Sequence, residues 1–325
     1  MADGARFTSD GRVMRGTGGL FLVRIDDDGS PLGGRTLRFR ARGGLKRDGV
    51  VAGDRVNVSY SDLSSDGRSG TDDTAGLPDG VIESVYERRN LMIRPPMANL
   101  DRLFIIVASA MPAPSTLMTD KLLAVCEYRG IEPAIVIGKS ELDPATAECL
   151  RDTYEKAGYP VFPLSCRTGE GTELLREHIS LIPEGTLCAF CGASGVGKTT
   201  LLNRLFPGIS LSEGEVSRKT GRGRHTTRIA EIFAFSPAGK VIFIADTPGF
   251  SMIDFENFDF LTLDALPGCM REFRPCYADC RWADCTHTGE SDCGVLAAVR
   301  EGRIAASRRE SYLEMYADLK KKSRK

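Results

Sequence analysis

The chain has 325 residues, of which 42% are hydrophobic and 27% are charged, so it is long enough for two or three globular domains with their own cores. A formal net charge of −1 excludes a uniformly basic protein that coats nucleic acid, although local basic patches are compatible with it. A small disulfide-rich scaffold is excluded as well, because five of the ten cysteines gather between Cys269 and Cys293.

The hydropathy pattern contains no segment that we expect to enter a membrane. The first residues lack an apolar run of signal-peptide length, and the longest strongly apolar run, 103–111, is about half a membrane span. We therefore expect a cytoplasmic protein without membrane contact, and we expect it to act as a monomer.

Residues 1–95 read as a small all-β barrel that forms the first domain. Short alternating stretches at 19–25, 35–42 and 54–60 are separated by turns rich in Gly, Asp and Ser. The polar segment 62–76 is predicted to be a loop.

From Leu103 onward the pattern changes to that of an α/β domain, which we place at 96–265. Near-continuous apolar runs alternate with helix-like stretches at 119–129, 144–157 and 171–179, which is typical of a buried parallel sheet. After Asp264 the chain becomes rich in cysteine and then helical, which predicts a third module at 266–325.

A phosphate-binding loop follows the strand-like run 186–190 and precedes a helix-like run. Its glycines let backbone N–H groups surround phosphates, Lys198 would reach the β and γ oxygens, and the Thr199 hydroxyl would bind Mg²⁺. A glycine-rich turn without a ligand is the alternative, which the strand–loop–helix setting disfavours. The residues expected at the phosphates are Gly192, Ala193, Ser194, Gly195, Val196, Gly197, Lys198, Thr199 and Thr200.

Two later motifs indicate a nucleotide switch. The strand-like run 241–246 ends in the sequence DTPG, where Asp246 would hold a water on Mg²⁺ and the Gly249 N–H would sense the γ-phosphate. A basic loop before it contains His225, Thr226 and Thr227, and one of these threonines would complete the Mg²⁺ shell.

Guanine-reading loops are expected upstream of the phosphate loop. The strand-like run 134–137 leads into Gly138, Lys139, Ser140 and Glu141, at the position of an NKxD motif. The run 161–164 leads into Ser165, Cys166 and Arg167, which match the second guanine-contacting loop, commonly Ser-Ala-Lys. This order of motifs is that of an ordinary G domain cut open between its third and fourth motifs. The sequence thus predicts a circularly permuted GTPase.

A metal site is predicted beyond the switch motifs. Cys280, Cys285, His287 and Cys293 place three thiols and one imidazole within fourteen residues, a closed set of the kind that structural zinc uses. The surrounding segment is polar, so the metal would supply its folding energy. Buried or redox-active thiols are the alternative. A saturated zinc would have no catalytic role.

The permuted motif order, the GRHTT switch, the DTPGF sequence and the cysteine cluster together resemble the bacterial GTPases that depend on the small ribosomal subunit, over nearly the whole chain. The resemblance implies an OB-fold for residues 1–95, bound GTP or GDP with Mg²⁺, and one zinc. It also implies GTP hydrolysis stimulated by the small subunit and its rRNA, with a role in late maturation of that subunit.

Two departures from this pattern leave rival functions open. Gly138 stands where the motif has Asn and Glu141 where it has Asp, which suggests an NTPase of loose base specificity or a loop without base contact. Phe250 stands where many GTPases have a water-orienting Gln, which suggests a nucleotide-gated RNA-binding module with little turnover. In a GTPase, His225 or a partner would supply the missing group; otherwise His225 is only a solvated loop residue.

Basic residues form three groups that could contact RNA phosphates. Each group could equally be ordinary solvated surface. They are Arg38, Arg40, Arg42, Lys46 and Arg47 in the barrel; Arg218, Lys219, Arg222, Arg224 and Arg228 in the switch; and the tail from Lys320.

Overall fold

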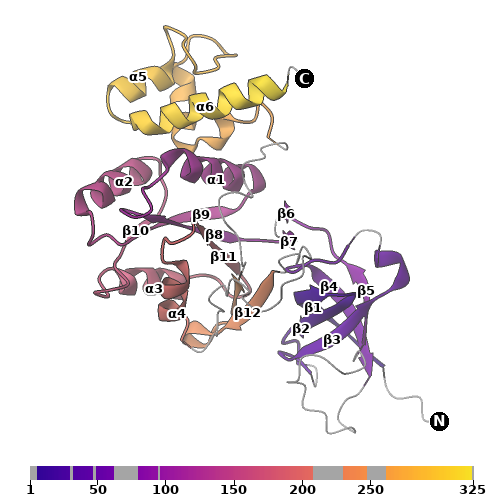
Figure 1. Ribbon diagram of the computed structural model, residues 1–325. Helices are drawn as coiled ribbons and strands as arrows, with labels where there is room; N and C mark the ends of the chain where they lie inside the picture. Colours follow the sequence, from indigo (N-terminus) through magenta and orange to yellow (C-terminus); the bar gives the residue numbers. More distant parts are fainter. Residues whose placement is uncertain are drawn as a thin grey trace, which may run out of the picture. The chain divides into compact units, whose positions relative to one another are not determined.

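The computed structural model describes residues 6–29, 32–46, 49–61, 80–93, 96–207, 230–246 and 261–323 (Figure 1). These residues divide into two compact units. The first unit comprises the described residues up to Leu100 together with 230–235 and 243–246, and the second comprises 101–207, 236–242 and 261–323. The domain boundaries at 95/96 and 265/266 stay predictions.

The first unit contains the predicted β-barrel. Its strands close in the order β1-β2-β3-β5-β4, with only the β3–β5 pair parallel, and this Greek-key order is that of an OB-fold. Alternation explains the core, because Leu37 and Phe39 of β3 are buried while Arg40 is exposed. The strands are β1 (Arg6–Thr17), β2 (Leu20–Ile25), β3 (Thr36–Ala41), β4 (Arg55–Ser61) and β5 (Gly80–Val85).

Three short elements accompany the barrel strands in the first hundred residues. A 3-10 turn, η1 (Gly43–Lys46), follows β3, and the antiparallel pair β6 (Leu91–Ile93) and β7 (Pro96–Ala98) follows the barrel. The predicted loop at 62–76 lies outside the described residues.

A six-stranded sheet has the order β10-β9-β8-β11-β13-β12, and its pairs β10–β9, β9–β8 and β8–β11 are parallel. β11, the strand that precedes the phosphate loop, is the fourth strand of this sheet in chain order, and it lies inside the sheet. A permuted G domain requires this placement. The strands are β8 (Arg102–Ala108), β9 (Glu132–Gly138), β10 (Val161–Pro163), β11 (Leu187–Gly192), β12 (Glu231–Phe235) and β13 (Ile242–Asp246).

Helices cover both faces of this sheet, with α1 and α2 on one side and α3 and α4 on the other (Figure 1). The helix predicted at 119–129 begins earlier, because Ser115 caps it by accepting a hydrogen bond from the Met118 N–H. The helices are α1 (Thr116–Arg129), α2 (Pro144–Lys156), α3 (Thr172–Ser180) and α4 (Lys198–Leu205), and a 3-10 turn, η2 (Pro237–Gly239), precedes β13.

The cysteine-rich segment is anchored to α1 by buried charge. Arg308 of α6 is fully buried and donates to Asp120 of α1 and to Glu272 of η5, each at 2.6 Å. The segment consists of η4 (Pro267–Cys269), η5 (Arg271–Asp279), α5 (Gly294–Arg300) and α6 (Ala306–Lys322). None of the helices in the described part of the chain has the length and apolar character needed to cross a membrane.

Replacing Arg308 with methionine is expected to lower the free energy of unfolding by about 3–5 kcal/mol, because it leaves two buried carboxylates without their cation. The control is Arg151→Ala, which removes an exposed pair with Glu148 and should change stability by about 0.5 kcal/mol or less. Urea unfolding curves measure both. A loss no larger than that of the control would show that the buried network contributes little.

Candidate functional site

The phosphate loop has the predicted strand–loop–helix geometry. β11 ends at Gly192, and α4 begins at Lys198 directly after its N-cap, Gly197. Gly195 and Gly197 have φ values of 80° and 96°, in the left-handed region that side chains disfavour. A Cβ on Gly192 would stand 2.6 Å from the carbonyl oxygen of Ile106. The backbone itself therefore requires these glycines.

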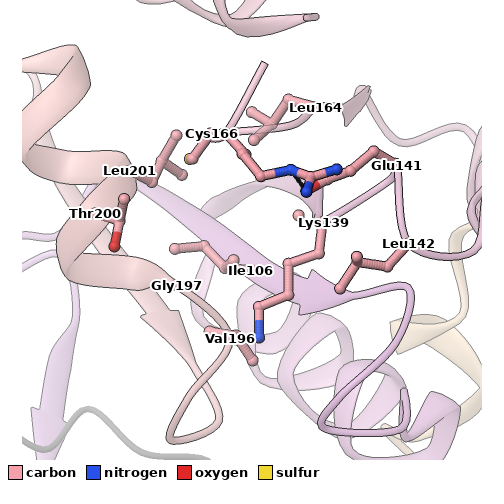
Figure 2. Close-up of a pocket in the computed structure, with 12 residues that line it drawn as sticks. Ile106, Lys139, Glu141, Leu142, Leu164, Cys166, Val196, Gly197, Thr200 and Leu201 are labelled. Atoms are coloured by element: carbon pink, nitrogen blue, oxygen red, sulfur yellow. Dashed lines mark ion pairs between the residues drawn. The ribbon is translucent and has the colours of Figure 1, made fainter. Parts of the chain in front are cut away.

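A cavity of about 330 Å³ lies where the loops after β9 and β10 meet the phosphate loop (Figure 2). That volume falls within the range of about 300–1,000 Å³ that small-molecule sites occupy. The carboxyl ends of parallel strands are where ligands bind in such sheets. The structure thus brings three motifs together in one place, with the lining residues Ile106, Gly138, Lys139, Glu141, Leu142, Leu164, Cys166, Arg167, Val196, Gly197, Thr200 and Leu201.

The two predicted guanine-reading loops are the first base loop, 138–141, and the second base loop, 165–167. Lys139 joins the first base loop to the phosphate loop. Its Nζ donates to the carbonyl oxygens of Gly195, at 2.7 Å, and of Met111. Figure 2 shows its side chain running past the cavity toward Val196. The next residue, Ser140, donates its N–H to the Leu164 carbonyl at 3.2 Å, which ties the two base loops together.

Glu141 brings a carboxylate to the cavity. Hydrogen bonding by the Ser165 side chain is the largest influence on it and holds the pKa of Glu141 below its usual value, so the group is ionised at neutral pH. Ser165 is fully buried, and its Oγ accepts the Thr168 N–H at 3.1 Å. An ionised carboxylate matches the N1 and N2 hydrogens of guanine.

The structure shows that Gly138 is not required by its backbone. Its φ lies outside the left-handed region, and a Cβ there would meet the Val196 carbonyl oxygen at 3.4 Å, an ordinary contact distance. An asparagine amide at this position could donate to the phosphate loop. The glycine therefore removes a brace without any steric gain.

Restoring the usual motif is expected to sharpen base choice. Gly138→Asn with Glu141→Asp should raise the ratio of GDP affinity to ADP affinity by about tenfold, because one well-placed hydrogen bond is worth about 1–3 kcal/mol of discrimination. Competition of each nucleotide against a fluorescent guanine nucleotide measures the ratio. Gly138→Ala with Glu141→Asp is the control that lacks the amide. An unchanged ratio in the Asn variant would show that this loop gains nothing from the brace.

Several predicted residues lie beyond the reach of the structure. His225, Thr226, Thr227, Gly249 and Phe250 lie outside the described residues, as does the basic switch group. Asp246 is the last residue of β13. The proposed Mg²⁺ shell and the source of the water-orienting group therefore stay predictions.

Two arginines belong to this site, and sequence reasoning missed one of them, Arg204. Arg204 donates to the Cys166 carbonyl at 3.0 Å, and Arg167 lines the cavity beside Glu141. Arg167 was expected in the loop after β10, where it occupies the place of the lysine in the usual Ser-Ala-Lys loop. Arg204 carried no such signal, since only the packing of α4 brings it to this loop.

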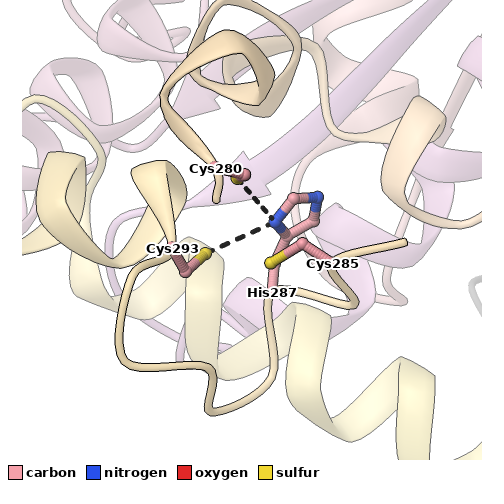
Figure 3. A group of neighbouring side chains, drawn as sticks. All are labelled: Cys280, Cys285, His287 and Cys293. Carbon is pink, nitrogen blue, oxygen red and sulfur yellow. Dashed lines mark hydrogen bonds between the residues drawn. The ribbon is translucent and has the colours of Figure 1, made fainter. Parts of the chain in front are cut away.

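The four predicted zinc ligands lie together. Their ligand atoms are all within 4.8 Å of one another, and the Nδ1 of His287 is 3.7 Å from the Cys280 Sγ and 3.4 Å from the Cys293 Sγ (Figure 3). Tetrahedral zinc, with bonds of about 2.3 Å to sulfur and 2.0 Å to nitrogen, separates such donors by about 3.5 Å. The fourth ligand, Cys285, completes a set that zinc fits.

Contacts around these ligands hold them in place. The Tyr277 ring stacks on His287 with centroids 5.0 Å apart, and the Gly294 N–H donates to the Cys280 Sγ at 3.3 Å. A Cβ on Gly294 would stand 2.3 Å from the Cys276 carbonyl oxygen, so this position needs glycine. Cys269 is buried and lies outside the ligand group.

Comparisons with known proteins point to one family. The sequence model of the RsgA GTPase family matches residues 85–256. Two relatives are named small ribosomal subunit biogenesis GTPase RsgA. The one from Alkaliphilus metalliredigens is 33% identical and covers 97% of this chain and 99% of its own. The one from Moorella thermoacetica is 35% identical and covers 95% of this chain and 97% of its own.

Solved structures show the same fold. YjeQ from Thermotoga maritima matches with a TM-score of 0.74 and 30% identity, over 96% of this chain and 99% of its own. YloQ, described as a circularly permuted GTPase, matches in fold with a TM-score of 0.70 and 24% identity, over 97% and 96% of the two chains. The chain therefore belongs to the RsgA GTPase family of GTP-hydrolysing enzymes.

Proposed function

We propose that this GTPase acts in late maturation of the small ribosomal subunit, and that the subunit stimulates its turnover. The observation that carries the proposal is the convergence of both base loops and the phosphate loop on one cavity, in a chain whose relatives are named for biogenesis of that subunit. The proposal places the protein in the cytoplasm as a monomer.

In this proposal different residues of the chain bind the phosphates, the base and the magnesium ion. Lys198 and the N–H groups of the phosphate loop neutralise and orient the phosphates, and Glu141 accepts hydrogen bonds from guanine. The magnesium ion, when bound, offsets negative charge on the phosphates, and Thr199, Asp246 and a threonine of the switch, Thr226 or Thr227, would hold it. Gly249 would sense the γ-phosphate. His225 or a group from the ribosomal partner would orient the attacking water.

The zinc site has a structural part in the proposal. Cys280, Cys285, His287 and Cys293 would hold one zinc ion with no open position, so this ion shapes the segment next to α6 and takes no part in hydrolysis. The barrel would supply RNA contacts through exposed basic side chains such as Arg40 of β3.

Phosphate release from GTP, measured alone and with purified small or large ribosomal subunits, tests this proposal. We expect slow release alone and at least about tenfold faster release with small subunits, since a group supplied by a partner can be worth about 10³–10⁵ in turnover. Large subunits should have little effect. Equal rates under all three conditions would contradict a role tied to the small subunit.

A second candidate, an NTPase of loose base specificity, is favoured by Gly138 and by the longer carboxylate of Glu141. ATP competing as well as GTP for the cavity would support it.

A further inference from the structure

Arg167 is a positively charged residue that lines the cavity between the base loops and the phosphate loop. It follows Ser165 and Cys166 in the second base loop, and its Nε lies 3.6 Å from the Oε1 of Glu141. The two side chains differ in exposure, with 74% of Arg167 and 15% of Glu141 accessible to solvent. A largely exposed guanidinium therefore reaches in to a largely buried carboxylate from the mouth of the cavity.

The second oxygen of Glu141 is the feature that calls for a ligand. Among the described residues, its Oε2 is buried and has no hydrogen-bond partner. A buried carboxylate oxygen is costly without a donor. Guanine offers two donors on one edge, N1–H and the 2-amino group, whereas adenine presents an acceptor at N1. The unpaired oxygen thus favours guanine.

A glutamate needs more support than the usual aspartate to do this. Its side chain has one more rotatable bond, so an unsupported carboxylate loses more conformational freedom when it binds the base. Gly138 cannot supply support, because it has no side chain. Ser165 and Arg167 are the two neighbours whose interactions favour the ionised carboxylate from the second base loop.

We propose that Arg167 is a positioning residue that determines base specificity, holding one oxygen of Glu141 so that the other is presented to guanine. This proposal rests on the proposed function, in that it assumes base reading at this loop. Arg167 does not touch the reacting phosphates; it acts on the substrate through Glu141. The chain thereby compensates for the glycine and glutamate that replace the usual asparagine and aspartate.

Affinities of the full-length protein for GDP, IDP and ADP test this role, by competition against a fluorescent guanine nucleotide. IDP lacks the 2-amino group, and ADP does not use the carboxylate. Arg167→Ala should weaken GDP binding by about three- to fivefold, the scale of a solvent-accessible ion pair, and leave ADP binding unchanged. The GDP preference over IDP should shrink as well, and Arg167→Lys should restore most of both.

The same substitution made in the Glu141→Asp variant separates a positioning role of Arg167 from general support of the fold. In Glu141→Asp, the shorter side chain moves away from the guanidinium, so Arg167→Ala should then have a smaller effect on GDP binding. Equal loss of GDP and ADP binding would show a structural role and overturn the proposal. Tighter GDP binding in Arg167→Ala would also overturn it, because the arginine would then be blocking the cavity.

The affinities of the parental protein for GDP and ADP separate a failure of base reading from a failure of the role given to Arg167. If it binds GDP no better than ADP, base reading at this loop fails and the role of Arg167 fails with it. If it prefers GDP and Arg167→Ala keeps the full preference, only the role of Arg167 is wrong.

Discussion

Replacing Lys198 with alanine is expected to lower GTP hydrolysis in the presence of small subunits by at least about 100-fold, the usual cost of losing a group that stabilises developing charge. Lys198 is the first residue of α4, directly after the loop that would surround the phosphates. Its charge would act on the β and γ oxygens, so the fold should be retained. Phosphate release and thermal unfolding of the same preparation measure the two effects.

The matched control is Lys156→Ala on α2, which removes an exposed lysine paired with the nearby Asp152. Its turnover should equal that of the parent. Hydrolysis by Lys198→Ala at the parental rate would mean that the active site has been assigned to the wrong loop.

Cys285→Ala is expected to abolish stoichiometric zinc binding and to unfold the segment 280–293 locally. The purified parent should contain about one zinc per chain, and structural zinc supplies about 10–16 kcal/mol of apparent binding energy in small domains at pH 7, so one lost ligand removes much of what orders this polar segment. Metal analysis and hydrogen exchange measure the two effects. Nucleotide binding should survive.

The structure suggests where this unfolding stops. η5 is held to α1 by Arg271 and Arg274, which both pair with Glu127, and these pairs do not involve the ligands. The control Cys149→Ala alters an exposed cysteine of α2 and should keep its zinc. A parent that stays fully folded after mild chelation has removed its metal would contradict a structural zinc site.

Local patterns predicted the elements well because they depend on neighbours along the chain. The alternation in 35–42 gave β3, and the glycine spacing before Lys198 gave a loop whose positive φ values the structure shows. The spacing of Cys280 to Cys293 likewise predicted which four ligands would meet.

Features that depend on distant residues could not be found this way. Arg308 lies in a helix with many charges and reads as surface, yet it is buried because Asp120, far away in the sequence, folds against it. The pairing of Arg167 with Glu141 has the same origin, since two separate strands bring their loops to one edge of the sheet. The permuted order of the strands could be predicted only because the nucleotide-binding motifs occur in a permuted order along the sequence.

Hydrolysis of GTP and ATP by one preparation, measured side by side with and without small ribosomal subunits, tests the central claim most directly. The account predicts slow GTP hydrolysis alone, stimulation by small subunits, and ATP hydrolysis at no more than about a tenth of the GTP rate, the discrimination that one lost hydrogen-bonded contact gives. Equal rates for GTP and ATP, unaffected by the subunits, would contradict a guanine-specific enzyme of ribosome assembly.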